Sequence, residues 1–538
     1  MRILAFLLLM VGFSSCGYYI MEPRWNDKVP LQPQTYPGID AQLSFAIDSS
    51  NLLIKKYAER PFPEWAITAK VEIPRVLVCK LLQGKEVAAV NQYLLSKNAP
   101  WGRSGSDWAL HKNGDYDFTE IGLIGLLYIM KDRPDLLYPA TQEHLVAKLL
   151  THSGGKPHLR MPGTLKTMQE TENHILMGEI SRYLRNQYLF EKGDTAMVFD
   201  NQKNGLEQWL LQHLRKKQER GFYEFNSMPY SGYSLTAINT LYSFAASPAI
   251  RYEAEVLLDK VVEDYTMGSY RFRRYPPFRR RMERVKLKGM DEDPMTSIVT
   301  TLLSIQLPDR KDKPALKNEH FAVFATLLKY RLKQEQISKL FEEKQDYMVT
   351  IGHGYRSSPE LYSAGKGYLI SGGGVQRRKT SQLIPRPIVL ILDDGIMTVD
   401  SCFRLCDKGS IGKWNNTGVW KDFACAASPI YIPPQYQAIY REGNWQVFQP
   451  SQHFKVLTYS GDNVSLLFID KSNMSTTNLV DKMKAANSSL DLKRQVTTPN
   501  GVQIKYNVHA PKDKWVIKEV DGKPLKRDVD DWLGLRYF

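Results

Sequence analysis

The sequence predicts a helical domain followed by a domain of antiparallel strands. Between about residues 40 and 345 the apolar residues recur at helical spacing, and after about residue 350 short β-branched or alternating runs replace them. Proline and glycine mark many of the connections. A series of helix pairs cannot bury each apolar face alone, so neighbouring pairs must stack. The predicted fold class is therefore an N-terminal (α/α) toroid of helix pairs over residues 41–345, followed by an antiparallel β-sandwich over residues 346–538.

The helices of the first part are predicted from apolar stripes with the period of an amphipathic helix. In the segment 234–246, for example, the stripe consists of Ile238, Leu241, Tyr242 and Ala245. Further helices are expected after residue 295. The predicted helices before that point cover residues 41–57, 85–97, 119–130, 142–151, 172–188, 205–216, 234–246 and 250–265.

The strands of the second part are predicted from short runs that turn signals separate, as in a sandwich. Asp393-Asp394-Gly395 stands between two such runs and predicts a hairpin turn. One segment, 479–486, has helical spacing instead. The predicted strands cover residues 388–392, 396–399, 445–448, 454–459, 464–468, 502–506 and 515–520.

The chain is strongly basic, with 72 Lys and Arg against 57 Asp and Glu, a net charge of +15 over 538 residues. Its 11% of aromatic residues excludes a largely disordered protein. A globular protein with this excess of positive charge is biased toward nucleic acid, an anionic membrane or an acidic polysaccharide. The alternative is that the positive charge only keeps the protein soluble. The distribution of the charged residues along the chain distinguishes these two interpretations.

Nine of the basic residues fall between residues 271 and 288, interleaved with aromatic residues. Aromatic rings stack on sugar rings, and guanidinium groups match the geometry of carboxylates and sulfates. A solvated basic face is the alternative. We expect this basic run to bind a polyanionic glycan, with the predicted substrate-binding arginines being Arg271, Arg273, Arg274 and Arg279.

The first residues have the layout of a secretory signal. Met1-Arg2 is followed by an apolar stretch of about ten residues, too short to span a bilayer. The stretch ends in Phe13-Ser14-Ser15-Cys16-Gly17, which resembles a bacterial lipobox. That resemblance implies a signal peptide over residues 1–15, lipidation of Cys16 and a tether over residues 16–40. We expect an outer-membrane lipoprotein that faces the periplasm, attached to the membrane through Cys16, with no nucleic-acid partner.

The remaining cysteines, Cys79, Cys402, Cys406 and Cys425, are too few for a disulfide scaffold. Cys402 and Cys406 are predicted to share one face of a strand, where they could join Cys425 in a bridge or a metal site. Small buried thiols are the favoured interpretation. We expect neither a metal nor a cofactor.

Two segments of the helical part combine residues that carry chemistry. Asn173 and His174 stand at the start of a predicted helix, and Tyr230 and Tyr233 end a loop that feeds the next long helix. In a ring of paired helices, loops one hairpin apart lie at the same end. These four side chains are therefore expected to line one site. A helix cap for the Asn-His pair and a packed loop for the tyrosines are the structural alternatives.

An Asn-His pair at a helix start, followed about 50 residues later by Gly-x-x-Glu-x-x-x-x-x-Tyr-x-x-Tyr, resembles the helical domain of alginate lyases and heparinase II/III-like polysaccharide lyases. Those families share the order of toroid and sandwich. The resemblance implies cleavage of a uronate-containing chain by β-elimination. It implies that Asn173 and His174 neutralise the carboxylate as uncharged donors and that Tyr230, or Tyr233 in its place, removes the C5 proton. Glu224 is expected to hold the loop and is counted with the substrate-binding residues.

Such lyases also draw a catalytic group from the second domain, and this sequence has no clear match for it. The best candidate is His353, with Tyr355 beside it as a substrate-binding residue. The other candidates near the domain boundary are Arg356, Tyr362 and Tyr368.

Two other functions remain open at this point. A glycoside hydrolase on the same scaffold needs two carboxylates across a cleft. A catalytically silent, glycan-binding lipoprotein would keep the fold without the chemistry. The acidic residues available to a hydrolase are Asp115, Asp117, Glu120, Glu170 and Glu172.

Overall fold

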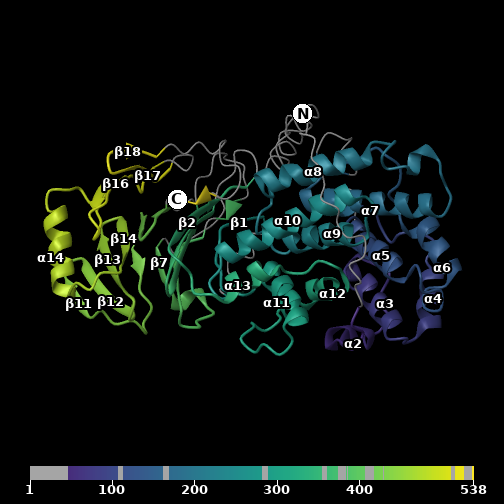
Figure 1. The fold of residues 1–538 in the computed structure, drawn as a ribbon, viewed down its shortest axis with the longest axis horizontal. Coiled ribbons are helices and arrows are strands. Elements are labelled where there is room, and N and C mark those ends of the chain that lie inside the picture. The colour runs from purple at the N-terminus through teal and green to yellow at the C-terminus, as the bar shows by residue number, and fades with distance from the viewer. Residues whose placement is uncertain are drawn as a thin grey trace, which may run out of the picture.

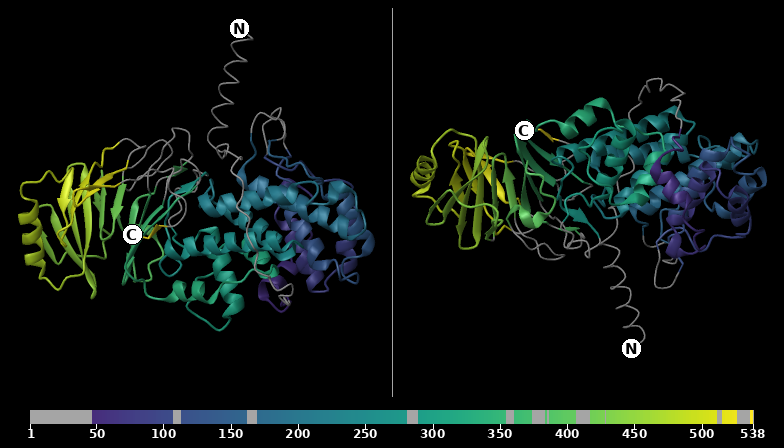
Figure 2. Two further views of the ribbon diagram at one scale, coloured as in Figure 1. Left: turned by 45° about the horizontal axis from the view of Figure 1, so that its top comes forward. Right: turned by 90° about the horizontal axis from the view of Figure 1, so that it is seen from below.

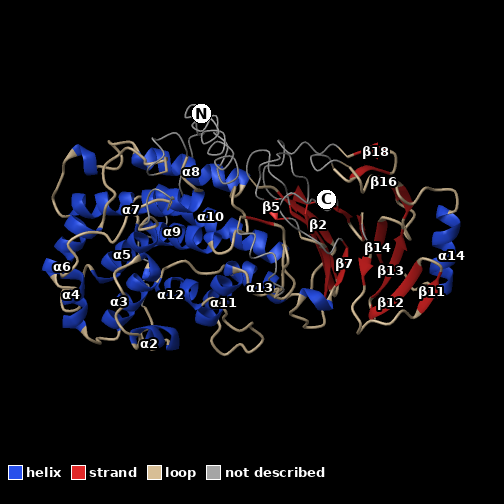
Figure 3. Cartoon of the chain, turned by 180° about the vertical axis from the view of Figure 1, so that it is seen from behind, coloured by secondary structure: helices blue, strands red, loops and turns tan. Residues whose placement is uncertain are grey.

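Helices occupy one end of the molecule and strands the other (Figure 1 and Figure 3). The computed structural model describes residues 47–106, 113–161, 169–280, 289–353, 360–373, 383–384, 386–405, 417–427, 429–510, 515–525 and 536–537. Within these residues a helical part is followed by antiparallel sheets, which confirms the predicted order of the two structural classes. The predicted signal peptide (1–15), Cys16 and the tether (16–40) lie outside the described residues.

The helices of the first part pack around one continuous apolar core. They are α2 (Leu52–Ala58), α3 (Glu72–Leu82), α4 (Val87–Leu95), α5 (Asp117–Met130), α6 (Pro139–His144), α7 (Glu172–Glu191), α8 (Leu206–Arg220), α9 (Tyr230–Phe244), α10 (Pro248–Met267), α11 (Pro294–Gln306), α12 (Glu319–Leu327) and α13 (Gln334–Phe341). α7 packs between α5 and α9, and α12 contacts α2 and α3 at the beginning of the part. Among the described residues no helix is long and apolar enough to cross a bilayer.

The first helix is shorter than its apolar pattern predicts. In the described part of the predicted segment 41–57, the helix begins only at Leu52. The side chain of Asn51 accepts a hydrogen bond from the Leu53 amide (2.9 Å) and caps the helix at this point. Asparagine is among the preferred N-cap residues because its oxygen satisfies an amide that the helix leaves unpaired.

The helix predicted over residues 142–151 also ends early, in a π-helical turn, Leu145–Leu149. The chain leaves the helix because the amide and hydroxyl of Thr151 donate to the buried carboxylate of Glu120 in α5 (2.5 and 2.8 Å). π-helical turns inside helices frequently mark functional sites. Here the turn brings the segment after residue 150 against α5 and α7.

The strands of the second part form antiparallel sheets, and two larger sheets share an apolar core. The seven-stranded sheet contains β2 (Tyr347–Ile351), β3 (Glu360–Gly365), β4 (Tyr368–Gly373), β6 (Ile388–Leu392), β7 (Phe403–Leu405), β10 (Ile430–Tyr431) and β19 (Arg536–Tyr537). The six-stranded sheet contains β8 (Thr417–Trp420), β9 (Phe423–Ala426), β11 (Tyr440–Glu442), β12 (Trp445–Ser451), β13 (Phe454–Gly461) and β14 (Val464–Asp470).

The far face of the six-stranded sheet is covered by a helix and a smaller sheet. The helix, α14 (Thr476–Asn487), confirms the helical spacing predicted over residues 479–486. The smaller sheet consists of β15 (Gln495–Thr497), β16 (Gln503–Tyr506), β17 (Ile517–Val520) and β18 (Lys523–Pro524). Of these elements, α14 lies at the end of the molecule farthest from the helical part (Figure 2).

The prediction of a strand over residues 396–399 is wrong, because an arginine of the helical part binds backbone carbonyls in and before this segment. Arg273 donates from Nη1 to the Ile396 carbonyl and to Asp394 (both 2.9 Å), and from Nη2 to the Leu392 carbonyl (2.5 Å). A backbone carbonyl that accepts a hydrogen bond from a guanidinium group is less able to accept one from the amide of a neighbouring strand. The turn predicted at residues 393–395 is therefore the place where Arg273 joins the two parts, not a hairpin between paired strands.

The junction of the two parts also contains an apolar cluster to which both contribute. A two-residue strand before residue 280, β1 (Phe278–Arg279), pairs with β5 (Leu383–Ile384) of the second part. The junction thus combines buried apolar surface, a strand pair and the buried Arg273. We expect the two parts to move together because the contacts between them are of all three kinds.

The cysteines of the described residues are buried thiols. Cys79, Cys402 and Cys425 form no disulfide with one another, and burial raises the pKa of Cys79 and of Cys402 to about 12. Cys402 and Cys425 belong to different apolar clusters, so the two do not form a bridge. Cys406 lies outside the described residues.

Candidate active site

The start of α7 and the loop before α9 lie side by side. The buried carboxylate of Glu172, the first residue of α7, accepts the amide hydrogens of Tyr223 (3.2 Å) and Glu224 (3.1 Å) and pairs with Lys217. Glu172 thus satisfies two loop amides at once and fixes the loop on the helix. The loop ends at Tyr230, the first residue of α9, which places that tyrosine next to the start of α7.

Arg280 connects three of the predicted site residues. Its Nη1 donates to Glu224 Oε1 (3.0 Å) and to Asn173 Oδ1 (3.4 Å). Its guanidinium carbon lies 4.1 Å from the centre of the Tyr230 ring. A planar guanidinium group can donate in its plane and stack on an aromatic ring with its face. Arg280 therefore sets the mutual positions of Asn173, Glu224 and Tyr230, which come from three separate segments of the chain.

Asn173 holds an unused pair of hydrogen-bond donors. Its side chain is fully buried, and the amide nitrogen has no partner in the part of the chain that the structure describes. Its oxygen accepts from the Thr171 hydroxyl (3.0 Å) as well as from Arg280, and these bonds fix the amide's orientation. An unsatisfied buried donor costs about 1 to 3 kcal/mol. A buried donor without a partner requires an explanation, and one explanation is a ligand that accepts its hydrogen bonds.

His174 is held by two acidic residues at the start of α5. Its Nδ1 lies 2.6 Å from Asp117 Oδ2, and its Nε2 lies 3.6 Å from Asp115 Oδ1. Burial favours the neutral ring, but the charge and hydrogen bond of Asp117, with Glu170 and Asp115, outweigh it and raise the pKa of His174 to about 9. The ring is therefore a cation at neutral pH and differs from the uncharged donor that the sequence predicts.

The pKa of His174 makes the stability of the fold depend on pH. Because its pKa is raised from 6.5 to about 9 on folding, its stabilisation is complete below pH 6.5 and is lost as the pH rises to about 9. The difference corresponds to about 3 kcal/mol. We expect His174→Gln to reduce the free energy of unfolding, measured with urea, by about 3 kcal/mol more at about pH 6 than at about pH 9.5.

The control for this measurement is His453→Gln, because His453 is exposed in a strand connection far from α5. Its replacement provides the reference curve against which the pH dependence of His174→Gln is compared. A pH-independent cost for His174→Gln would show that the ring is neutral in the folded protein.

A cleft of about 920 Å³ opens beside His174. Its lining comes from the beginning of α7 and from the segment 151–161, with Ser104 and Gly105 at the edge. The volume is in the range of sites that bind organic ligands. The charged residues of its lining are Lys156, Arg160 and His174, which is a cation, and the carboxylic acids Glu170 and Glu179.

The carboxylates that a glycoside hydrolase would use are engaged with the protein. Asp115, Asp117, Glu120, Glu170 and Glu172 each bind a side chain or amide of a neighbouring segment. Glu120, for example, accepts two amides and two hydroxyls. These carboxylates hold the backbone around the cleft in place.

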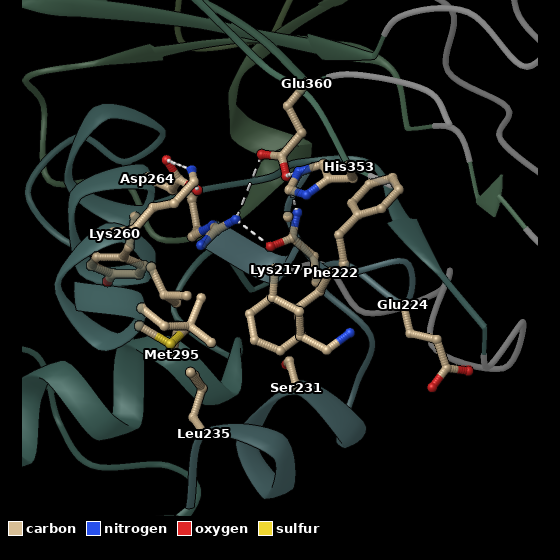
Figure 4. A pocket seen from close by; sticks show the side chains of 17 residues that line it. Lys217, Phe222, Glu224, Ser231, Leu235, Lys260, Asp264, Met295, His353 and Glu360 are labelled. Carbon is tan, nitrogen blue, oxygen red and sulfur yellow. Dashed lines mark hydrogen bonds and ion pairs between the residues drawn. The ribbon is translucent and has the colours of Figure 1, made fainter. Parts of the chain in front are cut away.

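The strand part of the chain contacts the loop before α9, residues 221–229 (the site loop), through Glu360, the first residue of β3 (Figure 4). Its buried carboxylate accepts from Asn226 Nδ2 (2.5 Å) and His353 Nε2 (2.7 Å), and Arg274 lies 3.8 Å away. The His353 ring stacks on Phe225 with 4.1 Å between centroids. These residues surround a cavity of about 60 Å³. His353, predicted as a catalytic group, therefore supports the site loop and does not line the cleft beside His174.

Most of the predicted substrate-binding arginines are internal. Arg273 and Arg274 are buried at the junction of the two parts. Arg279 is buried too, with its guanidinium carbon 4.2 Å from the centre of the Tyr223 ring. Arg271 is exposed and pairs with Asp393 (3.1 Å). The alternation of arginine and aromatic residues that predicted a sugar-binding surface serves here as internal packing. The rest of the basic run, residues 281–288, lies outside the described residues.

Tyr233 lies near Tyr230 on α9 but faces apolar neighbours. Its ring packs edge-on against Phe118, with 4.7 Å between centroids, and contacts Phe321 at 4.9 Å. The His174 ring packs on the same Phe118 at 5.3 Å. Tyr233 thus belongs to the wall behind His174.

Two of the remaining candidates, Tyr362 and Tyr368, do not line the cleft beside His174. Tyr362 and Tyr368 are buried among the strands, where each donates to a carboxylate. Burial and Asp422 raise the pKa of Tyr368 far above its usual value. Tyr355 and Arg356 lie outside the described residues.

The sequence prediction misses Arg280 and Glu360 as organisers of the site. Arg280 stands in a run of arginines, and no local signal distinguishes it from its neighbours. The contact between Glu360 and Asn226 spans 134 residues. Asn226 has a φ of 49°, in the left-handed region that asparagine tolerates better than most residues. The asparagine in this loop is therefore the one sequence signal that could have indicated a left-handed backbone position here.

Comparison with known proteins gives no relative from which a role could be carried over to these residues. No family model matches the chain, and no curated protein matches it.

Proposed function

We propose that this protein is an exported lipoprotein that cleaves a uronate-containing polysaccharide by β-elimination. The observation that carries the proposal is the convergence on Arg280 of Asn173, Glu224 and Tyr230. Arg280 thereby joins Asn173 and Tyr230, two of the residues that the proposed reaction uses, and His174, which follows Asn173 in α7, lines the cleft together with Lys156 and Arg160. The signal segment and Cys16 support export and membrane attachment, and nothing in the chemistry requires a cofactor.

In the proposed reaction the substrate carboxylate binds the amide hydrogens of Asn173 and the protonated ring of His174. These donors stabilise the negative charge that develops when the proton leaves the neighbouring C5 atom. Tyr230 acts as its phenolate: its oxygen accepts that proton, the C5 electron pair forms the C4–C5 double bond, and the bond from C4 to the bridging oxygen breaks. The proton then passes to the departing oxygen, so the products are an unsaturated uronate and a new chain end.

The proposed fold is a ring of helix pairs followed by a β-sandwich. The contacts of α12 with α2 and α3 support the ring, because they join the end of the helical part to its beginning. The apolar core that the two larger sheets share supports the sandwich. In such a ring, the loops at one end surround a common cleft.

The engaged carboxylates favour elimination over hydrolysis. An inverting or retaining hydrolase needs one acid that can donate and one carboxylate that can act as base or nucleophile. Glu120, with two amides and two hydroxyls bound, has little capacity left for either task. Asn173, in contrast, has donors to offer.

The proposal is tested by incubating the purified protein with polygalacturonate, alginate, hyaluronan, chondroitin sulfate and heparan sulfate. We expect ultraviolet absorbance from the unsaturated product to rise with at least one of them. New reducing ends without that absorbance would identify a hydrolase. Binding without cleavage of any of the five would favour the glycan-binding lipoprotein.

A further inference from the structure

The part of the cleft wall formed by the segment 151–161 is fixed by hydrogen bonds. The amide of His152 donates to Glu120 (3.0 Å), and the amide of Gly154 donates to Asn186 (2.9 Å) in α7. The amide of His158 donates to Glu179 (2.8 Å), also in α7. The wall is therefore held at three points and presents its side chains in defined positions.

Two imidazole rings stack on this wall. The rings of His152 and His158 lie 5.7 Å apart between centroids, with 25° between their planes. Burial lowers the pKa of His152, which leaves a neutral ring. Gly178 of α7 faces it, and a Cβ atom there would come within 3.2 Å of His152 Nε2. The absence of a side chain at Gly178 keeps the space beside the rings open.

The charged groups around the rings are predominantly positive. Lys156 and Arg160 line the cleft and form no ion pair in the part of the chain that the structure describes. The two acidic residues of the lining are already engaged. Glu170 accepts from two amides (3.0 and 2.8 Å). Glu179 accepts from Arg182 (2.8 Å) in addition to the His158 amide. An anion would therefore meet unpaired cations here.

The spacing along α7 relates this region to the proposed reaction centre. Gly178 follows His174 by four residues, slightly more than one helical turn, or about 6 Å along the helix axis. That length is comparable to one sugar unit of a polysaccharide. We propose that Lys156 and Arg160, with the paired rings of His152 and His158, form a second anion-binding subsite for the sugar unit next to the reacting one. The inference rests on the proposed function for the position of the reacting unit.

The subsite predicts a preference for chains that carry acidic groups on adjacent units. A uronate homopolymer does so through its carboxylates, and a chain that alternates uronate with a sulfated amino sugar does so through sulfate. A chain that alternates uronate with an uncharged amino sugar does not. The two anionic sources share the same recognition chemistry, because carboxylate and sulfate both accept from ammonium and guanidinium groups.

The test measures binding by calorimetry in a Tyr230→Phe background, so that no ligand is cleaved. The ligands are defined hexasaccharides of galacturonate, of hyaluronan and of chondroitin 6-sulfate. We expect Lys156→Ala/Arg160→Ala to weaken the first and the third about tenfold or more and to leave hyaluronan within about twofold. A loss with galacturonate alone would restrict the subsite to carboxylates, and a loss with chondroitin 6-sulfate alone would restrict it to sulfates.

Lys203→Ala is the matched control, because that lysine is 72% exposed on the helical part and lies outside the cleft lining. An equal loss for all three ligands, or a loss no larger than that of the control, would overturn the subsite. Binding that shows the contrast in a protein without lyase activity would keep the subsite and refute the proposed reaction. Lyase activity without the contrast would do the reverse.

Discussion

Replacement of Tyr230 by phenylalanine is expected to lower kcat for uronate cleavage by about a thousandfold, the scale of a lost proton-transfer group. The phenylalanine ring keeps the stacking surface on which Arg280 lies, at 4.1 Å in the native protein. The substitution therefore removes the oxygen and little else. The rate of absorbance increase at saturating substrate measures the effect, and binding of an uncleaved oligosaccharide should change by less than about threefold, because the carboxylate contacts remain.

The neighbouring tyrosine provides the control. Tyr233→Phe keeps the ring that packs on Phe118 and Phe321, so we expect its kcat to stay within about threefold of the wild type. If Tyr233→Phe were the inactive variant and Tyr230→Phe the active one, the base would have to be reassigned to Tyr233. Loss of activity in both, with normal unfolding curves, would indicate that both hydroxyls contact the reacting unit.

The long elements of the fold could be predicted from the sequence because their side-chain pattern is local. The helix predicted over residues 172–188 is α7, which runs from Glu172 to Glu191, and the strand predicted over residues 388–392 is β6. The apolar residues of α7 recur at helical spacing, and β6 is a short continuous apolar run with all five residues buried, so pattern and packing agree in both. The strand predicted at residues 396–399 fails for the opposite reason. The backbone there is bound by Arg273, which lies more than 120 residues earlier in the chain, so the local pattern does not determine its conformation.

The candidate site could be predicted only where it depends on the order of the helices. Asn173 and Tyr230 meet because α7 and α9 pack together, which follows from neighbouring hairpins. The charge state of His174 could not be foreseen, since it depends on Asp117, 57 residues away. Nor could the burial of Arg273, Arg274 and Arg279, because a run of arginine and aromatic residues has the same composition whether it faces solvent or a domain junction.

Loss of Arg280 is expected to lower both catalysis and stability. Arg280→Ala removes the donor to Asn173 and the cation over Tyr230, and we expect kcat/KM to fall about a hundredfold or more. It also leaves the Glu224 carboxylate, which is 5% exposed, without its partner. An uncompensated buried charge destabilises a protein by about 3 to 5 kcal/mol. The assay must therefore be accompanied by urea unfolding of the same variant.

The double variant Arg280→Ala/Glu224→Gln resolves the two effects. A neutral amide at position 224 no longer needs a cation, so most of the lost stability should return. Activity should not return, because neither substitution restores the orientation of Asn173 or the stacking on Tyr230. Recovery of both quantities together would mean that Arg280 acts only by neutralising Glu224. Recovery of stability alone would establish Arg280 as the group that aligns the carboxylate-binding amide with the proposed base.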